Sequence, residues 1–276
     1  MEIRYSRDPQ SFIRMSTAEI REEFLIADLF TPGEIKLVYS NVDRMIIGSA
    51  VPTHQPLNLE AGAELRAKYF AQRRELGVFN IGGQGSITVD GHEYGMAYQE
   101  MLYIARGSQA ISFSSADASQ PARFYIVSLP AHKAYSTTHI AKVQANRIEA
   151  GSAEAANART INQYIYEGGV PSCQLVMGFT ELMPGSVWNT MTAHTHERRS
   201  EVYLYFNLTG DNVVFHLMGD PHETRHIVVR DGQVVISPSW SIHAGAGTSN
   251  YNFVWAMGGE NQAFDDMDPA PLDQVA

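Results

Sequence analysis

The chain of 276 residues has one cysteine, Cys173, no basic run and no long apolar run. One cysteine excludes an intramolecular disulfide and a thiolate metal cluster, and a lone cysteine is more typical of a core than of a nucleophile. Twenty basic against 30 acidic residues give a formal charge of −10, which argues against nucleic acid and anionic membranes as partners. No apolar stretch approaches the roughly 18 residues of a membrane-spanning helix. The first ten residues lack the apolar core of a signal peptide, so we expect a soluble, cytoplasmic protein.

Most of the chain has the pattern of short β-strands. Apolar, β-branched segments such as 75–81, 123–129 and 251–257 alternate with turn signals of Gly, Asp, Ser and Pro. Many short strands at even spacing are typical of a sandwich or a barrel. Near the N-terminus, Ser16 and Glu19 have the spacing of a capping box and predict a short helix.

The strands form two series that resemble each other. The segment 79–83 (FNIGG) recurs as 206–210 (FNLTG), and the segment 90–93 (DGHE) recurs in the same order as 220–223 (DPHE). Matches in the same order at a nearly constant separation predict a duplicated β-domain.

The domain boundaries are expected where one series gives way to the other. Residues 1–145 are predicted to form the first domain and residues 161–276 the second. The stretch 146–160 between them is polar, rich in small residues and without a β pattern, so we interpret it as a linker.

The stretch 193–206 (AHTHERRSEVYLYF) has the residue types of a metal site. On an extended strand, His194 and His196 point the same way, because side chains alternate with a period of two. Glu201 joins them only if a bulge or bend between residues 197 and 200 breaks the alternation. Two imidazoles and one carboxylate are three ligands of a metal site, and His243 is the candidate for the fourth. The alternative is a pair of surface histidines on a polar strand.

Together with Gly185, Gly232 and Pro238, these four residues resemble the two sequence motifs of the cupin superfamily. The resemblance implies an all-β fold of two tandem cupin barrels, each a double-stranded β-helix of the jelly-roll type, preceded here by a short N-terminal helix. The chain departs from the motifs in two places. The segment between Gly185 and the first histidine is longer than usual, and Trp240 replaces a usual glycine, so we expect a different barrel mouth.

The first repeat lacks the ligands of the second. Ala110 stands in the place of His243, and no histidine occurs between residues 67 and 75. We therefore expect one metal-binding barrel, the C-terminal one, and one barrel that serves packing or assembly.

A narrower resemblance runs through most of the chain. The segments HTHERR, EVYLYFN, ETRHIV, ISPSWSIHAG and WAMGGENQAFDDMD resemble the family of 4-deoxy-L-threo-5-hexosulose-uronate ketol-isomerases of pectin degradation. This resemblance implies a zinc-binding enzyme that converts 5-dehydro-4-deoxy-D-glucuronate, a small anionic sugar acid, to 3-deoxy-D-glycero-2,5-hexodiulosonate. It also implies a homo-oligomer, often a hexamer.

The ligand types alone do not select the metal. Zn²⁺ fits three imidazoles and a carboxylate, and so do Fe²⁺, Mn²⁺ and Ni²⁺. In an isomerase the ion would act as a Lewis acid while a positioned group moves a proton between adjacent carbons. Glu201, Tyr203 and Tyr205 are the candidate catalytic residues, since they share one strand face, with Glu197 as a weaker candidate. Tyrosines in a barrel wall can equally serve packing alone.

A substrate carboxylate calls for a guanidinium, which holds it through two parallel hydrogen bonds. Arg198, Arg199 and Arg225 are the predicted substrate-binding residues, because they are nearest to the ligands in sequence. The alternative for each is a solvated or interface arginine.

Two other functions fit the same ligands. One is an Fe²⁺-dependent cupin dioxygenase, which an oxygen-uptake assay would reveal, and the other is a non-catalytic sugar-binding bicupin with a structural metal. The segment from His222 to His226 also fits the HExxH pattern of zinc proteases. It follows a turn and leads into a β-branched run, and two histidines four residues apart on a strand lie too far apart to share a metal. We therefore reject the protease interpretation.

Overall fold

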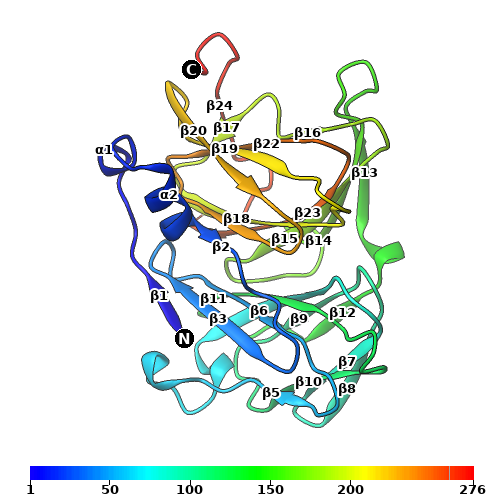
Figure 1. Cartoon of the computed structure of the whole chain (residues 1–276). Coiled ribbons are helices and arrows are strands. Elements are labelled where there is room, and N and C mark those ends of the chain that lie inside the picture. Colours follow the sequence, from blue (N-terminus) through cyan, green and yellow to red (C-terminus); the bar gives the residue numbers. More distant parts are fainter. Residues whose placement is uncertain (261) are drawn as a thin grey trace. The chain divides into compact units, whose positions relative to one another are not determined.

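The computed structural model describes residues 1–260 and 262–276. Close contacts group the chain into two compact units, drawn in Figure 1. Unit 1 consists of Met1–Arg4, Leu29–Ala145 and Tyr164–Val176, and unit 2 consists of Tyr5–Asp28, Asn146–Gln163 and Met177–Ala276.

Unit 1 is built from two β-sheets. Its strands are β1 (Glu2–Arg4), β3 (Ile35–Ser40), β4 (Ile46–Ala50), β5 (Leu57–Asn58), β6 (Arg74–Asn80), β7 (Gly85–Val89), β8 (His92–Met96), β9 (Met101–Ile104), β10 (Ile111–Ser115), β11 (Phe124–Pro130) and β12 (Thr138–Ile140). Short 3₁₀ turns cover Ala63–Leu65, Phe70–Gln72 and Lys142–Gln144. The sheets have the strand orders β1-β3-β4-β11-β6-β9-β12 and β5-β10-β7-β8. Leu76 and Val78 of the first sheet pack with Ile87 and Phe113 of the second in one buried core, as in a jelly roll.

Unit 2 repeats this construction. Its strands are β2 (Leu25–Ile26), β13 (Asn146–Ala150), β14 (Arg159–Ile165, ending in the part grouped with unit 1), β15 (Val176–Leu182), β16 (Trp188–Asn189), β17 (His194–Thr195), β18 (Arg199–Phe206), β19 (Val214–Asp220), β20 (Glu223–Val229), β21 (Val234–Ser237), β22 (Ile242–Gly247), β23 (Asn252–Gly259) and β24 (Asp268–Pro269). They form the sheets β13-β14-β15-β23-β18-β21-β2 and β16-β22-β19-β20, and β17 pairs with β24.

The two strand orders correspond. The run β4-β11-β6-β9 of unit 1 matches β15-β23-β18-β21 of unit 2, and β5-β10-β7-β8 matches β16-β22-β19-β20. The expected all-β, jelly-roll fold is confirmed, and each unit contains one such pair of sheets.

The N-terminal helices α1 (Pro9–Phe12) and α2 (Thr17–Phe24) belong to unit 2. The expected capping box is present, since the Glu19 N–H donates to the Ser16 side chain while the Glu19 carboxylate accepts from the Ser16 N–H. Helix α2 buries Ile20 and Phe24, and Arg21 donates to the Val228 carbonyl of β20 at 2.8 Å. No helix in the described residues combines the length and apolarity needed to cross a membrane.

The stretch 146–160, which we interpreted as a linker, contains a strand. Residues Asn146–Ala150 form β13, which pairs antiparallel with β14 from Asn146 opposite Gln163 to Ala150 opposite Arg159. Most side chains of β13 are exposed on both faces. No apolar alternation marks the strand in the sequence because backbone pairing and polar side-chain contacts hold it, such as Thr160 donating to Glu149 at 2.9 Å.

A buried carboxylate attaches the segment Tyr164–Val176 to the rest of unit 1. Glu75 is fully buried in β6 and accepts hydrogen bonds from the backbone N–H groups of residues 173, 174 and 175 at 2.7–3.0 Å. The Tyr103 hydroxyl donates to the same carboxylate at 2.8 Å. Burial, and then the charge of Glu75, raises the pKa of Tyr103, so the phenol stays a donor.

Candidate metal centre and pocket

Three elements of unit 2 bring the predicted ligands together. His194 lies on β17, Glu201 on β18 and His243 on β22, while His196 lies between β17 and β18. The Arg199 N–H donates to the His196 carbonyl at 3.2 Å and closes a tight turn before β18 begins. This turn breaks the strand alternation where a bend was expected, and it lets Glu201 face the histidines.

The four ligating atoms lie within 4.8 Å of one another. The Nε2 atoms of His243 and His194 are 2.9 Å apart, and Glu201 Oε2 lies 3.1 Å from Nε2 of His196 and 3.2 Å from Nε2 of His243. Two ligands about 2.1 Å from one ion are roughly 3.0 Å apart at right angles and 3.4 Å apart at tetrahedral angles. The spacing therefore fits a single cation, and the four side chains can hold a metal ion. The rest of the described chain contains no other such group.

The second nitrogens of two rings face backbone carbonyls. His196 Nδ1 lies 2.9 Å from the Arg199 oxygen, and His243 Nδ1 lies 3.3 Å from the Ser241 oxygen. A carbonyl only accepts, so each Nδ1 carries a hydrogen, and in the neutral ring each Nε2 then presents a lone pair toward the shared centre. Such outer contacts fix the tautomer that a metal ligand needs.

Burial controls the protonation of the cluster. It lowers the pKa of His194 to about 4, and together with the neighbouring imidazoles it holds the pKa of His243 well below its usual range. Burial also lowers the pKa of His196, but the hydrogen bond and the charge of Glu201 outweigh it and raise that pKa. His194 and His243 are therefore neutral at neutral pH, which is the state that binds a metal.

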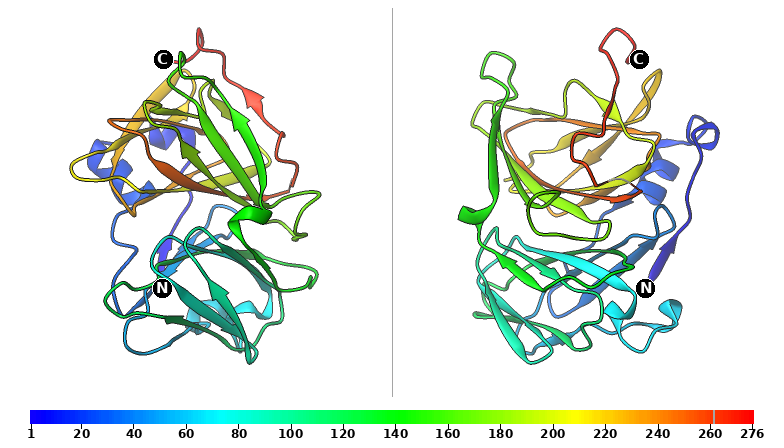
Figure 2. Two further views of the ribbon diagram at one scale, coloured as in Figure 1. Left: turned by 90° about the vertical axis from the view of Figure 1, so that its right-hand side faces the viewer. Right: turned by 180° about the vertical axis from the view of Figure 1, so that it is seen from behind.

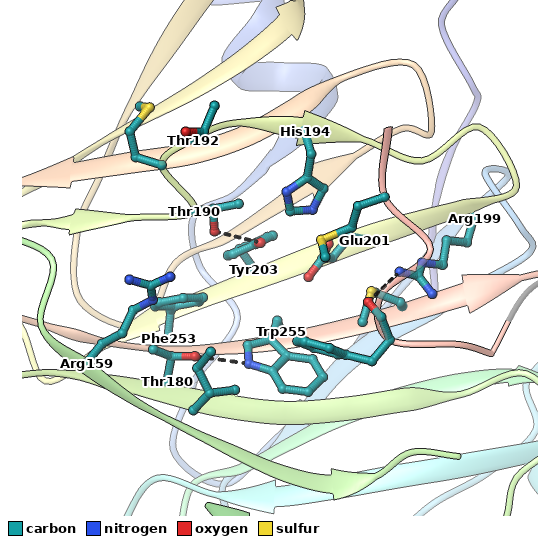
Figure 3. Close-up of a pocket in the computed structure, with 15 residues that line it drawn as sticks. Arg159, Thr180, Thr190, Thr192, His194, Arg199, Glu201, Tyr203, Phe253 and Trp255 are labelled. Carbon is teal, nitrogen blue, oxygen red and sulfur yellow. Dashed lines mark hydrogen bonds between the residues drawn. The ribbon is translucent and has the colours of Figure 1, made fainter. Parts of the chain in front are cut away.

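A cavity of about 290 Å³ opens beside the cluster (Figure 3). Its walls come from the inward faces of β14, β15, β23 and β18, from the loop before β17, and from the C-terminal segment. The lining residues are Arg159, Ile161, Thr180, Thr190, Met191, Thr192, His194, Arg199, Glu201, Tyr203, Phe253, Trp255, Met257, Phe264 and Met267. Two of the ligands, His194 and Glu201, thus face a space large enough for a small molecule.

The two candidate catalytic tyrosines occupy different surroundings. Tyr203 lines the cavity, and its hydroxyl lies 3.4 Å from Thr190 Oγ1. Burial, and then the charge of Glu201, holds the pKa of Tyr203 well above its usual range. Tyr205 is not among the lining residues, and its hydroxyl lies 2.7 Å from His216 Nδ1 in the interior of the unit. Tyr203 can therefore reach a molecule in the cavity, and Tyr205 is engaged with His216.

The three arginines predicted to bind substrate are engaged by the protein. Arg198 pairs with Asp266 and Asp268, and Arg225 pairs with Glu223; neither lines the cavity. Arg199 does line it, but its guanidinium donates to the backbone carbonyls of residues 263, 264 and 266. Of the three, only Arg199 lines the cavity, and its terminal nitrogens already donate to carbonyls of the C-terminal segment.

A fourth arginine, Arg159, lines the cavity, and no sequence pattern predicted it as a substrate-binding residue. It is the first residue of β14 and lies at the edge of the stretch interpreted as a linker. Phe253 and Trp255 were also missed, although they form part of the wall. Strands β14 and β23 reach the cavity through sheet pairings that local sequence does not reveal.

The corresponding interior of unit 1 is different. Arg74 stands five residues before Phe79, as Glu201 stands five residues before Phe206. Its guanidinium donates to the side chain and carbonyl of Ser128. Ala110, expected in the place of His243, precedes β10, and Ile111 is the residue that enters the core.

The two histidines of the HExxH pattern in unit 2 are not on a helix, since His222 precedes β20 and His226 lies within it.

Comparisons with known proteins agree with this architecture. The chain is 57% identical over 272 residues to a 4-deoxy-L-threo-5-hexosulose-uronate ketol-isomerase of Lachnoclostridium phytofermentans, which covers 99% of both chains. Its fold is similar to an IolB-like protein of Salmonella typhimurium, with a TM-score of 0.68, 12% identity and coverage of 87% of this chain and 94% of that one. It is also similar to Bacillus subtilis oxalate decarboxylase, with a TM-score of 0.59, 10% identity and coverage of 87% and 78%. The KduI/IolB family model matches residues 25–272, and the chain belongs to this family.

Proposed function

We propose that the protein is a ketol-isomerase that converts 5-dehydro-4-deoxy-D-glucuronate to 3-deoxy-D-glycero-2,5-hexodiulosonate in the breakdown of pectin. The observation that carries this proposal is a cluster of three imidazoles and a carboxylate of which two members, His194 and Glu201, face a cavity of about 290 Å³. The relative from Lachnoclostridium phytofermentans, 57% identical over nearly its whole length, bears the name of this activity.

The cluster suits Zn²⁺, with Fe²⁺, Mn²⁺ and Ni²⁺ as alternatives for the same ligand types. His194, His196, Glu201 and His243 would hold the ion through the Nε2 and Oε2 atoms that already converge. When bound, the ion supplies a Lewis acid that favours negative charge on a substrate oxygen.

The reaction moves one hydrogen from C2 to C1 of the sugar acid and one proton from the C2 hydroxyl to the C1 oxygen, so that the C1 aldehyde becomes an alcohol and the C2 alcohol becomes a ketone. Glu201 is the one acidic side chain among the described lining residues, and we assign its carboxylate the role of accepting the C2 proton and delivering a proton to C1. Tyr203, whose pKa is raised by burial, keeps its proton and donates a hydrogen bond to the substrate oxygen that gains charge.

The apolar wall supports this chemistry. Phe253, Trp255, Met257 and Phe264 line the cavity beside the two polar groups. They limit the access of water, which strengthens hydrogen bonds to a developing negative charge.

The test is to incubate the purified, metal-replete protein with the uronate and to follow C1 and C2 by NMR, with oxygen uptake recorded in parallel. Formation of the diketo acid without oxygen uptake supports an isomerase. Oxygen consumption would indicate a dioxygenase, and tight binding without turnover would indicate a sugar-binding protein. Running the reaction in D₂O shows the route, because proton transfer through an enediol incorporates deuterium at C1 and a hydride shift does not.

The metal assignment has its own test. His243→Ala removes one ligand, and we expect it to lose most bound metal and at least 100-fold in kcat, since a ligand and its buried geometry are both lost. His243→Gln keeps the side-chain volume and distinguishes loss of ligation from misfolding. His222→Ala is the matched control, because His222 is exposed and lies outside the cluster. Unchanged metal content in both His243 variants would refute the assignment.

Assembly as a homo-oligomer, with a hexamer as the form implied by the family resemblance, is part of the same proposal, as is a place in the cytoplasm. Light scattering at several protein concentrations measures the assembly directly.

A further inference from the structure

We propose that Arg159 binds the carboxylate of the substrate, at the end of the cavity away from the metal ligands. This inference rests on the proposed function and deepens it, since it names the group that recognises the acid and sets the direction in which the sugar lies.

The position of Arg159 suits this role. Figure 3 shows Arg159 at one end of the cavity and His194 and Glu201 nearer the other end, with Tyr203 and Phe253 between them. A hexuronate carries its carboxylate and its aldehyde at opposite ends of one carbon chain. A molecule held by Arg159 through its acid therefore extends its C1 and C2 toward Glu201.

The guanidinium of Arg159 lacks an acidic partner in the described part of the chain. One nitrogen donates to the Asn157 carbonyl at 2.9 Å, and the titratable groups that act on Arg159 are the neutral phenols of Tyr203 and Tyr251. In contrast, Arg198 and Arg225 pair with carboxylates. Arg159 is thus a half-buried cation whose charge the protein leaves uncompensated at a cavity wall.

Uncompensated positive charge is notable in a chain with a formal charge of −10. Holding a half-buried guanidinium costs free energy, which an anionic ligand recovers by pairing with it in a water-poor cavity. The remaining donors of the planar fork match the two oxygens of a carboxylate.

Arg199 does not offer the same site. Its two terminal nitrogens donate to three backbone carbonyls of the C-terminal segment, and its side chain is 1% exposed. To bind a carboxylate, Arg199 would have to break these hydrogen bonds. Arg159 can bind one with its remaining donors and keep its hydrogen bond to the Asn157 carbonyl.

The experiment compares the uronate with its methyl ester, which has the same carbon skeleton without the charge. The variants are Arg159→Gln and Arg159→Lys. The matched control is Arg147→Gln, which removes the same charge from an exposed residue of the neighbouring strand β13 that pairs with Glu149. For each protein we measure kcat and KM for both compounds, metal content, and calorimetric binding of the non-reacting C1 alcohol of the acid.

We expect Arg159→Gln to lower kcat/KM for the acid about 100-fold, mainly through KM, while the ester changes less than about twofold. Arg159→Lys keeps the charge but not the fork, so a loss of about tenfold is expected for the acid. Binding of the C1 alcohol should weaken in parallel, with metal content unchanged.

The proposal is overturned if the preference for acid over ester survives both substitutions, or if acid and ester lose activity equally. Should Arg159→Gln fail to fold, the Lys variant and the binding measurement decide. Failure of the proposed function is distinguishable, because wild-type protein would then bind the C1 alcohol without isomerising the uronate, and the effect of Arg159 on that binding would still be measured.

Discussion

Substitution of Arg199 by glutamine should release the C-terminal segment, residues 262–276, from the wall of the cavity. The guanidinium donates to the Ala263, Phe264 and Asp266 carbonyls, the last two at 3.1 Å. The segment also pairs β24 with β17, and the Ala270 N–H donates to the Ala193 carbonyl at 2.9 Å. Figure 2 shows this segment, in red, running beside the strands of unit 2.

The size of the effect follows from the bonds that are lost. Hydrogen bonds from a charged donor contribute about 1.5–3 kcal/mol each. Three of them set an upper limit, because the freed carbonyls at the surface regain water when the segment opens. A net loss of about 3 kcal/mol is the expected result, which is roughly a 100-fold increase in the open population.

Hydrogen exchange of the amides in residues 262–276, followed by mass spectrometry, measures that population. Arg198→Gln is the control, since Arg198 pairs with Asp266 and Asp268 in partly exposed ion pairs that solvent screens. We expect a rise of about 100-fold in exchange for the Arg199 variant and a few-fold at most for the control. Equal exchange in the wild type and the Arg199 variant would show that the guanidinium does not hold the segment.

Release of the segment should also be visible in catalysis. Phe264 and Met267 line the cavity, and the Phe264 ring lies 5.2 Å from the Trp255 ring, centre to centre. Without them the cavity opens to water on one side. KM for the uronate should therefore rise more than kcat falls, because the change removes a wall of the cavity and leaves the metal ligands in place.

Two further predictions concern stability. Glu75→Gln should lower the free energy of unfolding by about 2–4 kcal/mol, measured by urea denaturation, because an amide cannot accept from all the backbone N–H groups that the buried carboxylate serves. Burial lowers the pKa of His216 to about 3. Between about pH 6.5 and pH 3 the unfolded chain therefore binds a proton at this residue that the folded protein does not bind. The free energy of unfolding decreases as the pH is lowered through this range. His216→Gln should reduce the slope of unfolding free energy against pH by up to about 1.4 kcal/mol per pH unit between pH 6 and 4; an unchanged slope would show that His216 is protonated in the fold.

The cluster that can hold a metal ion was predictable because its members lie in short sequence patterns. His194, His196 and Glu201 fall within eight residues, and His243 follows a turn marked by Pro238. Their residue types limit the chemistry to metal binding or acid–base work, and the strand period predicts which side chains share a face. The structure adds the turn that lets Glu201 face the histidines.

The cavity wall was not predictable in the same way. Arg159 reaches the cavity because β14, β15, β23 and β18 are neighbours in one sheet, although they are far apart in the chain. Arg199 holds the C-terminal segment through its carbonyl oxygens. Every residue has a carbonyl oxygen, so no residue type in the segment predicts this contact. Proximity in sequence favoured Arg198 and Arg225 as substrate-binding residues, but their carboxylate partners engage both.

The two units share one sheet topology but differ in their interiors. Unit 1 has a packed apolar core, and unit 2 has the candidate site. The inward residues Leu76 and Val78 of β6 correspond to Tyr203 and Tyr205 of β18, counted back from Phe79 and Phe206. An interior of hydroxyls and imidazoles is costly unless each polar atom has a partner.

Unit 2 gives most of these groups at least one partner, in two layers, although His216 Nε2 and Asn189 Oδ1 have none. In the deeper layer Tyr205 contacts His216, and Asn189 donates to Tyr251 at 2.9 Å. Around the candidate metal centre the outer nitrogens of two imidazoles face carbonyls, while the inner nitrogens of His194 and His243 approach to 2.9 Å. A shared cation would bind both inner nitrogens through their lone pairs, so the grouping of imidazoles that is costly in an apolar interior is also what suits this interior to a metal ion.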